Sequence, residues 1–124
     1  MKSHRTLLLI ESGLSLKDCK TALEQSGYAV LTARSSRQGL KLLQSLSVDA
    51  VLLDGAAEAK RNGSSVAARV RKQNPSVRIL MTGTALPERA LYLADGFIDN
   101  RNRPEFFPML LDRLLRREKR AHAA

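Results

Sequence analysis

Short apolar runs alternate with longer amphipathic segments along almost the whole chain, and this alternation is the feature that most constrains its fold. The apolar runs, each of strand length, occupy residues 6–10, 28–33, 50–53, 77–81 and 97–98. Between them, apolar residues recur at the spacing of one helical face. A strand, a helix and a further strand in succession require a crossover connection, which makes the strands parallel and covers both faces of the sheet. The pattern therefore predicts an α/β fold, a doubly wound, five-stranded parallel sheet of the (βα)5 type in a three-layer sandwich.

Capping residues mark the ends of several predicted helices. Gly27 can supply the left-handed residue that ends the first helix, and the hydroxyls of Ser35 and Ser36 can cap the start of the second. A short helix is expected to begin at Pro87. The final helix is expected over residues 104–121, where Pro108 should remove a hydrogen bond and kink it. The apolar positions of the first three helices are Leu16, Cys19 and Leu23, then Leu40, Leu43 and Leu46, then Val66, Ala67 and Val70.

Size and composition indicate one globular domain over residues 1–124. A hydrophobic content of 44% is enough for a single core of ordinary size. The longest apolar runs are far shorter than the roughly 20 residues that cross a bilayer, and the N-terminal run is too short for a signal peptide, so we expect a cytoplasmic protein without a membrane partner. The single cysteine, Cys19, cannot form an internal disulfide. The histidines His4 and His122 lie near opposite termini, so no metal cluster of Cys and His is expected.

The formal net charge of +9 raises the hypothesis of a nucleic-acid partner, because clustered Lys and Arg side chains release counterions from a phosphate backbone. Two groups of basic residues carry much of this charge. One group flanks the third helix and the other crowds the C-terminal end: Lys60, Arg61, Arg69, Arg71, Lys72 and Arg78, and then Arg113, Arg116, Arg117, Lys119 and Arg120. No aromatic residues interleave these clusters. Solvated helix faces are therefore the favoured interpretation, and a nucleic-acid partner is not expected.

Polar side chains stand where three of the predicted strands end. Glu11 follows the first strand, Asp54 the third and Thr82 the fourth. In a doubly wound sheet, the functional crevice lies outside the carboxyl ends of the strands. Two carboxylates and a hydroxyl are therefore expected to converge on one edge of the sheet, although Asp before Gly is also ordinary turn chemistry.

From residue 6 to about residue 117, the sequence resembles the receiver domain of bacterial two-component response regulators, and chemotaxis regulators in particular. The resemblance is carried by the stretches LLLIES, EQSGYAVLTARSSRQGLKLLQSLSVDAVLLD, RILMTG, and ADGFIDN followed by PEFF. It implies a flavodoxin-like fold for a core of about residues 5–117, followed by a basic tail over residues 118–124. It also implies phosphorelay signal transduction, in which Asp54 accepts a phosphoryl group from a histidine kinase or a phosphotransfer protein.

The resemblance further implies a Mg²⁺ site, which this sequence should weaken. Its ligands would be Glu11, Asp54 and the backbone carbonyl of Ala56. Receivers carry two adjacent acids after the first strand, and here Ser12 replaces the second, so one formal charge beside the cation is lost. The loop after Asp54 also lacks the family's proline and is one residue longer before Asn62, which could displace the Ala56 carbonyl.

A second departure lies at the predicted fifth strand, after which receivers carry a lysine that pairs with the phosphoryl group. Alignment on the glycine, the aromatic residue and the Pro-Glu pair places Asn100 there, and an amide cannot supply a charge. Arg103 is the less favoured match. The resemblance assigns Thr82 as the switch hydroxyl and Phe97 as the switch aromatic. For Phe97, plain core packing is at least as good an interpretation.

The resemblance also implies an interaction face on the fourth helix, fifth strand and fifth helix, through which receivers dimerise or contact partners. In this chain the face would carry Phe106, Phe107, Arg113, Arg116 and Arg117. We infer a receiver domain with a degenerate acidic pocket. It is not expected to be an independent enzyme, because no pairing of a nucleophile with a base is readable elsewhere. Two alternatives stay open: a pseudo-receiver that binds proteins without phosphorylation, and a nucleic-acid-associated domain that uses the basic helices.

Overall fold

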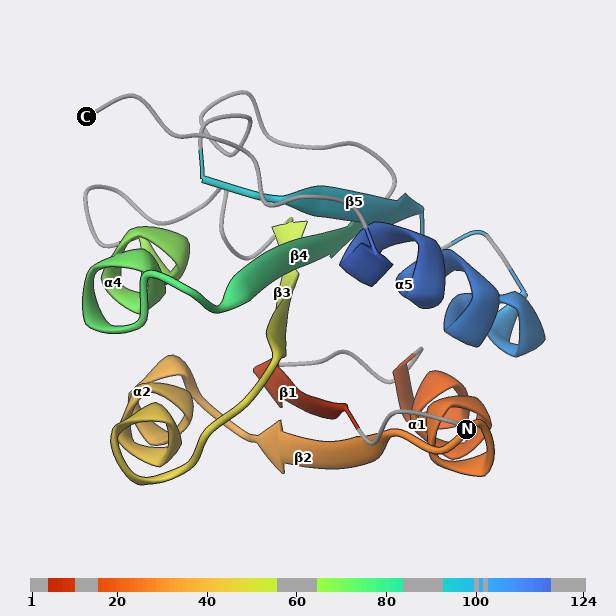
Figure 1. Cartoon of the computed structure of the whole chain (residues 1–124), viewed down its shortest axis with the longest axis horizontal. Helices are drawn as coiled ribbons and strands as arrows, with labels where there is room; N and C mark the ends of the chain where they lie inside the picture. Colours follow the sequence, from red (N-terminus) through yellow and green to blue (C-terminus); the bar gives the residue numbers. More distant parts are fainter. Residues whose placement is uncertain are drawn as a thin grey trace.

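The computed structural model describes residues 5–10, 16–55, 65–83, 93–99, 101 and 103–116. The strands are β1 (Thr6–Ile10), β2 (Ala29–Ala33), β3 (Ala50–Asp54), β4 (Arg78–Gly83) and β5 (Gly96–Asp99). They form one sheet in the order β2-β1-β3-β4-β5, and all neighbouring pairs are parallel (Figure 1). This order confirms the predicted doubly wound, flavodoxin-like sheet.

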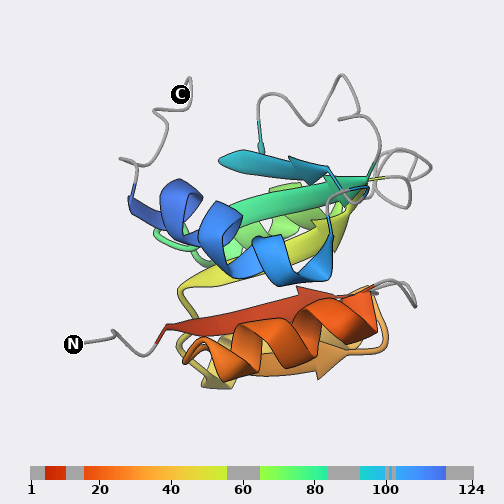
Figure 2. The same cartoon turned by 90° about the vertical axis from the view of Figure 1, so that its right-hand side faces the viewer.

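Helices cover both faces of this sheet. They are α1 (Leu16–Gln25), α2 (Ser36–Ser45), α4 (Val66–Gln73), the short 3-10 helix η2 (Pro104–Phe106) and α5 (Phe107–Arg116). Helices α2 and α4 lie on one side of the sheet, and α1 and α5 lie on the other (Figure 1; Figure 2 gives the view turned by 90°). Alternate residues of β1 and β3 therefore enter two separate apolar clusters, one on each side of the sheet.

Helix α2 can lie close to β1 because Gly39 has no side chain. A Cβ at this position would stand 2.4 Å from Cδ1 of Ile10. At the start of α2, the Ser35 hydroxyl accepts a hydrogen bond from the Gln38 amide at 3.1 Å, and the Gln38 side chain accepts one from the Arg34 amide at 2.8 Å. The predicted Ser35 cap is confirmed, and these bonds satisfy amides that the helix itself leaves without partners.

A backbone conformation and a hydrogen bond fix the connection between α1 and β2. Gly27 follows α1 in the left-handed conformation, with a φ of 98°, as predicted. The next residue, Tyr28, donates a hydrogen bond from its hydroxyl to the Asp112 carboxylate of α5. Burial, with the help of this bond, raises the pKa of the Tyr28 hydroxyl well above its usual range. The edge of the sheet is thereby tied to the last helix.

Some predicted boundaries were wrong. Leu46 lies beyond the end of α2 and is 43% exposed, so it does not belong to the buried stripe of that helix. Pro108 does not break a helix at its middle, because η2 occupies the preceding residues and α5 begins at Phe107. Pro108 thus falls in the first turn of α5, where a missing N–H removes no intrahelical bond. The short helix predicted from Pro87 lies outside the described residues, as do residues 117–121 of the predicted last helix.

The described part of the chain holds no helix that is long and apolar enough to cross a membrane. Cys19 is buried in the cluster between the sheet and the helices α1 and α5. It packs there as a small apolar residue, as the sequence predicts.

Candidate functional site

The carboxyl edge of the sheet brings two of the predicted site residues together. Asp54 is the last residue of β3, and Thr82 lies in β4, which runs further than predicted and ends at Gly83. In the parallel register, Asp54 pairs with Thr82, and Thr82 pairs with Ile98 of β5. Thr82 is only 4% exposed, whereas Asp54 is partly exposed. A carboxylate that solvent can reach therefore lies beside a buried threonine.

The other predicted members of the metal pocket lie outside the described residues. They are Glu11, Ser12, the Ala56 carbonyl and Asn100. Within the described ranges, no three His, Cys, Asp or Glu side chains are grouped as a metal site. The Asp54 carboxylate is a hard oxygen donor of the kind that Mg²⁺ prefers. The described residues at this edge therefore supply one ligand of the kind that the cation needs. The other ligands stay a prediction.

Phe97, the predicted switch aromatic, lies in β5 and pairs with Met81 of β4. It is partly buried and packs against the apolar cluster on the side of α2 and α4. This packing is what the core interpretation requires. A switch role needs a second position of the ring and stays a prediction.

An ion pair that was not predicted lies at the end of β5. Asp99 accepts hydrogen bonds from Nε and Nη2 of Arg101, at 3.0 and 2.5 Å, and from the Arg101 backbone amide at 2.9 Å. These bonds lower the pKa of Asp99 to about 2. The pair flanks Asn100 in the sequence, so the arginine next to the predicted lysine position is already bound by a carboxylate. The signal was present in the sequence, because an aspartate commonly binds the amide two residues further on.

Arg103, the alternative match for the lysine position, forms a different ion pair. Its Nε lies 2.7 Å from Oε1 of Glu105, and both side chains are largely exposed. Because β5 ends at Asp99, Asn100 is the next residue along the chain, whereas Arg103 directly precedes η2. The choice of Asn100 stays a prediction, but Arg103 has no place in the strand.

The predicted interaction face loses one member to the core. Phe107 is 1% exposed and packs in the cluster on the side of α1 and α5, so its assignment to an exposed face was wrong. The start of α5 at Phe107 decides which of the two adjacent phenylalanines is buried. The exposed residues that recur along η2 and α5 form what we call the α5 stripe: Phe106, Met109, Arg113 and Arg116. Arg117 lies outside the described residues.

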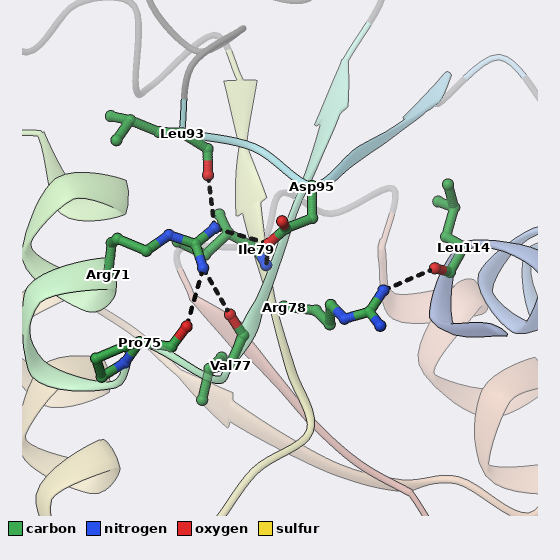
Figure 3. A network of polar contacts seen from close by, with 8 residues as sticks. All are labelled: Arg71, Pro75, Val77, Arg78, Ile79, Leu93, Asp95 and Leu114. Atoms are coloured by element: carbon green, nitrogen blue, oxygen red, sulfur yellow. Dashed lines mark hydrogen bonds and ion pairs between the residues drawn. The ribbon is translucent and has the colours of Figure 1, made fainter. Parts of the chain in front are cut away.

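Arg71 belongs to a buried polar network rather than to a solvated helix face (Figure 3). Its Nη2 lies 2.7 Å from Oδ2 of Asp95, whose side chain is 2% exposed. The same Asp95 oxygen accepts a hydrogen bond from the Ile79 amide at 2.8 Å. The guanidinium also donates to three backbone carbonyls, those of Pro75, Val77 and Leu93. The network joins α4, the start of β4 and the segment before β5.

Arg78 also uses its charge inside the molecule. Its Nη1 donates to the Leu114 carbonyl of α5 at 3.3 Å (Figure 3). The interpretation of the first basic group as a solvated face was therefore wrong for Arg71 and Arg78. Both guanidinium groups bind backbone carbonyls, and they do so toward the end of β4 that is opposite to Thr82.

A parallel sheet in this strand order, with a carboxylate at the end of its third strand, has the flavodoxin-like architecture that receiver domains share. The family model of the response regulator receiver domain matches residues 9–95, and the chain belongs to that family. The protein is accordingly a module of two-component signalling and not a catalytic enzyme.

Several solved structures share the fold. The chemotaxis response regulator CheY4 of Vibrio cholerae is 23% identical, with a TM-score of 0.74 over 90% of this chain and 99% of that chain. A response regulator from Thermotoga maritima is 17% identical, with a TM-score of 0.73 over 91% and 98% of the two chains. A CheY-like receiver domain protein from Methanospirillum hungatei JF-1 is 20% identical, with a TM-score of 0.72 over 91% and 94%. No curated protein sequence matches this chain.

Proposed function

We propose that this receiver domain accepts a phosphoryl group on Asp54 from a histidine kinase or a phosphotransfer protein, in a pocket of reduced charge. The observation that supports this function is the pairing of Asp54, at the end of β3, with the buried Thr82 of β4. Membership of the receiver family supports a histidine kinase as the kind of partner.

In the proposed reaction, a carboxylate oxygen of Asp54 attacks the phosphorus atom of a phosphohistidine. The new O–P bond makes an acyl phosphate, the N–P bond breaks, and the imidazole nitrogen keeps the electron pair and takes up a proton. Thr82 then donates its hydroxyl hydrogen to a phosphoryl oxygen. Bound Mg²⁺ would neutralise charge on the phosphoryl oxygens, and Glu11, Asp54 and the Ala56 carbonyl would hold it.

The reduced charge of the pocket sets how well this reaction should proceed. Ser12 stands where a second carboxylate would bind the cation, and Asn100 stands where an ammonium would bind the phosphoryl group. Hydrogen bonds in which one partner is charged are roughly twice as strong as those between neutral groups. We therefore expect weak Mg²⁺ binding and slow phosphorylation.

The same two substitutions favour an alternative, a pseudo-receiver that never takes phosphate. Partner binding would then depend on the α5 stripe alone. Its exposed Phe106 and Met109 can supply the apolar anchors that protein interfaces require, and Arg113 and Arg116 favour an acidic partner.

Beryllofluoride with Mg²⁺, which imitates an acyl phosphate, distinguishes the two functions. At millimolar Mg²⁺ we expect it to shift the amide NMR signals of Asp54 and Thr82. The Asp54→Asn variant, which keeps the size of the side chain, should show no such shift. Unchanged spectra of the parent protein under these conditions would support the pseudo-receiver.

A variant with restored charges tests the reason given for weak binding. Ser12→Asp combined with Asn100→Lys should strengthen beryllofluoride binding by roughly tenfold or more, since each change adds a charged partner. A folded double variant that binds no better than the parent would contradict this reason. The lengthened loop after Asp54 would then be the next feature to test.

A further inference from the structure

The sheet separates the charged residues of the chain into two unlike faces. On one side, neither α2 nor α4 contains a single acidic residue. On the other side, α1, η2 and α5 carry acidic and basic residues together: Glu24, Glu105 and Asp112 with Lys20, Arg113 and Arg116. Among the described helices, those on the side of α2 and α4 therefore carry only positive charge, whereas those on the other side carry both signs.

The helices α2 and α4 carry four exposed cations, and we call the surface that these side chains form the α2–α4 face. They are Arg37, Lys41, Arg69 and Lys72. The members on each helix are about one turn apart. Helices α2 and α4 contact each other on the same side of the sheet (Figure 1), and packed helices lie about 8–10 Å apart. None of the ion pairs between described residues includes any of these four side chains. The result is two neighbouring rows of accessible positive charge.

The α2–α4 face lacks the features of a protein-binding surface. The other exposed positions on its helices are Gln38, Gln44, Ser45, Ala68 and Gln73. Protein interfaces depend on buried aromatic and aliphatic anchors. Of the three large apolar side chains that are exposed in the described residues, Leu46 lies at the end of α2, whereas Phe106 and Met109 belong to the α5 stripe on the opposite side. Binding to a phosphate backbone requires clustered Lys and Arg but no apolar anchor.

We propose that the α2–α4 face binds the phosphate backbone of duplex nucleic acid without reading its sequence. This binding goes beyond phosphorylation and does not depend on Asp54. It revises the expectation from the sequence, in which the lack of aromatic residues argued against nucleic acid. Aromatic stacking serves unpaired bases, and a duplex offers its phosphates instead. Arg71 does not add to the positive charge of this surface, because its guanidinium forms an ion pair with the buried Asp95.

Fluorescence anisotropy of a labelled DNA duplex with the full chain tests this binding. Each neutralised phosphate contributes about −0.9 to the slope of log K against log salt concentration, so four engaged cations predict a slope of about −3.6. Arg37→Gln combined with Arg69→Gln removes one cation from each row. This pair should reduce the magnitude of the slope by about 2 and weaken binding at low salt by roughly tenfold.

Arg113→Gln combined with Arg116→Gln is the matched control, because it removes the same charge from the other side of the sheet. Its slope should stay close to that of the parent protein. Equal losses in both variants, or no salt-dependent binding by the parent, would overturn the proposal. Tighter binding of poly-glutamate than of the duplex would overturn it in favour of an acidic protein. Circular dichroism checks folding, and Lys41→Gln with Lys72→Gln repeats the test should the first pair misfold.

Discussion

At the scale of single residues, Asp99 and Arg101 keep the end of β5 close to electrically neutral. The resemblance to receivers predicts a cation at this point, but here the guanidinium of Arg101 already makes charged hydrogen bonds to a carboxylate. The charge of Arg101 is therefore already matched by the carboxylate of Asp99. The low pKa of Asp99 is the measurable sign of this pairing.

Arg101→Ala should raise the pKa of Asp99 from about 2 toward its ordinary value of 3.8, because the side-chain hydrogen bonds from Arg101 are the main cause of the shift. Since the folded-state pKa is the lower one, the pair stabilises the fold above pH 3.8, and this contribution is lost as the pH falls toward 2. NMR titration of the Asp99 carboxyl carbon measures the pKa. Arg103→Ala is the control, because its partner is Glu105. An Asp99 pKa that stays near 2 without Arg101 would contradict the assigned cause.

The sequence could locate some site residues and not others, for physical reasons. Asp54 and Thr82 were predictable neighbours because parallel connections bring the carboxyl ends of strands to one edge. Phe107 was misplaced because Phe106 and Phe107 are adjacent and alike, and only the start of α5 decides which is buried. The pairing of Arg71 with a distant aspartate depends on the folded topology, which no local sequence pattern reports.

At the scale of elements, the ion pair of Arg71 with Asp95 fixes α4 against β4 and the entry to β5. The Asp95 carboxylate also accepts a hydrogen bond from the Ile79 amide (Figure 3). At the point where the pairing of β4 with β5 begins, this side chain therefore takes the place of a backbone carbonyl as the acceptor. A buried charge of this kind stabilises the fold only while both partners are present.

Asp95→Ala should lower the free energy of unfolding by roughly 2–4 kcal/mol, since it leaves the Arg71 charge and the Ile79 amide without their carboxylate. Asp95→Asn keeps an acceptor oxygen and should lower it by only about 1 kcal/mol. Urea unfolding followed by circular dichroism measures both. Equal losses in the two variants would show that the acceptor oxygen is unimportant and that the network does not join these elements as described.

The described elements themselves were largely predictable, because strand and helix periods differ and the sequence alternates between the two patterns. Their ends were less so. The capping serine of α2 was readable from its hydroxyl and its position. The division of the last helix into η2 and α5 was not, because a 3-10 turn and the first turn of an α-helix accept the same Pro-rich sequence.

At the scale of the whole molecule, the sheet sorts charge as well as apolar side chains. Periodicity predicts that helices cover both faces, but the count of basic residues does not say which helices share a side. Once α2 and α4 are placed together, Arg37 and Lys41 become like charges one turn apart on a face without acids. Like charges at this spacing destabilise a helix by about 0.2–0.5 kcal/mol. The repulsion between Arg37 and Lys41 therefore makes α2 slightly less stable than it would be with neutral side chains at these positions.

Arg37→Glu should raise the stability of the protein while it weakens the binding of the α2–α4 face to DNA. The substitution turns a repulsive pair with Lys41 into an attractive one, and it places an acid in the first turn of α2, which now has none. We expect the free energy of unfolding to rise by about 1 kcal/mol in urea titrations at low salt, with a smaller gain at high salt. Binding to a DNA duplex should fall by more than in Arg37→Gln, because a repulsive charge replaces a neutral side chain. A variant that gains stability and also keeps the parent's affinity would exclude Arg37 from the binding surface, whereas a loss of stability would contradict the account of charge on α2.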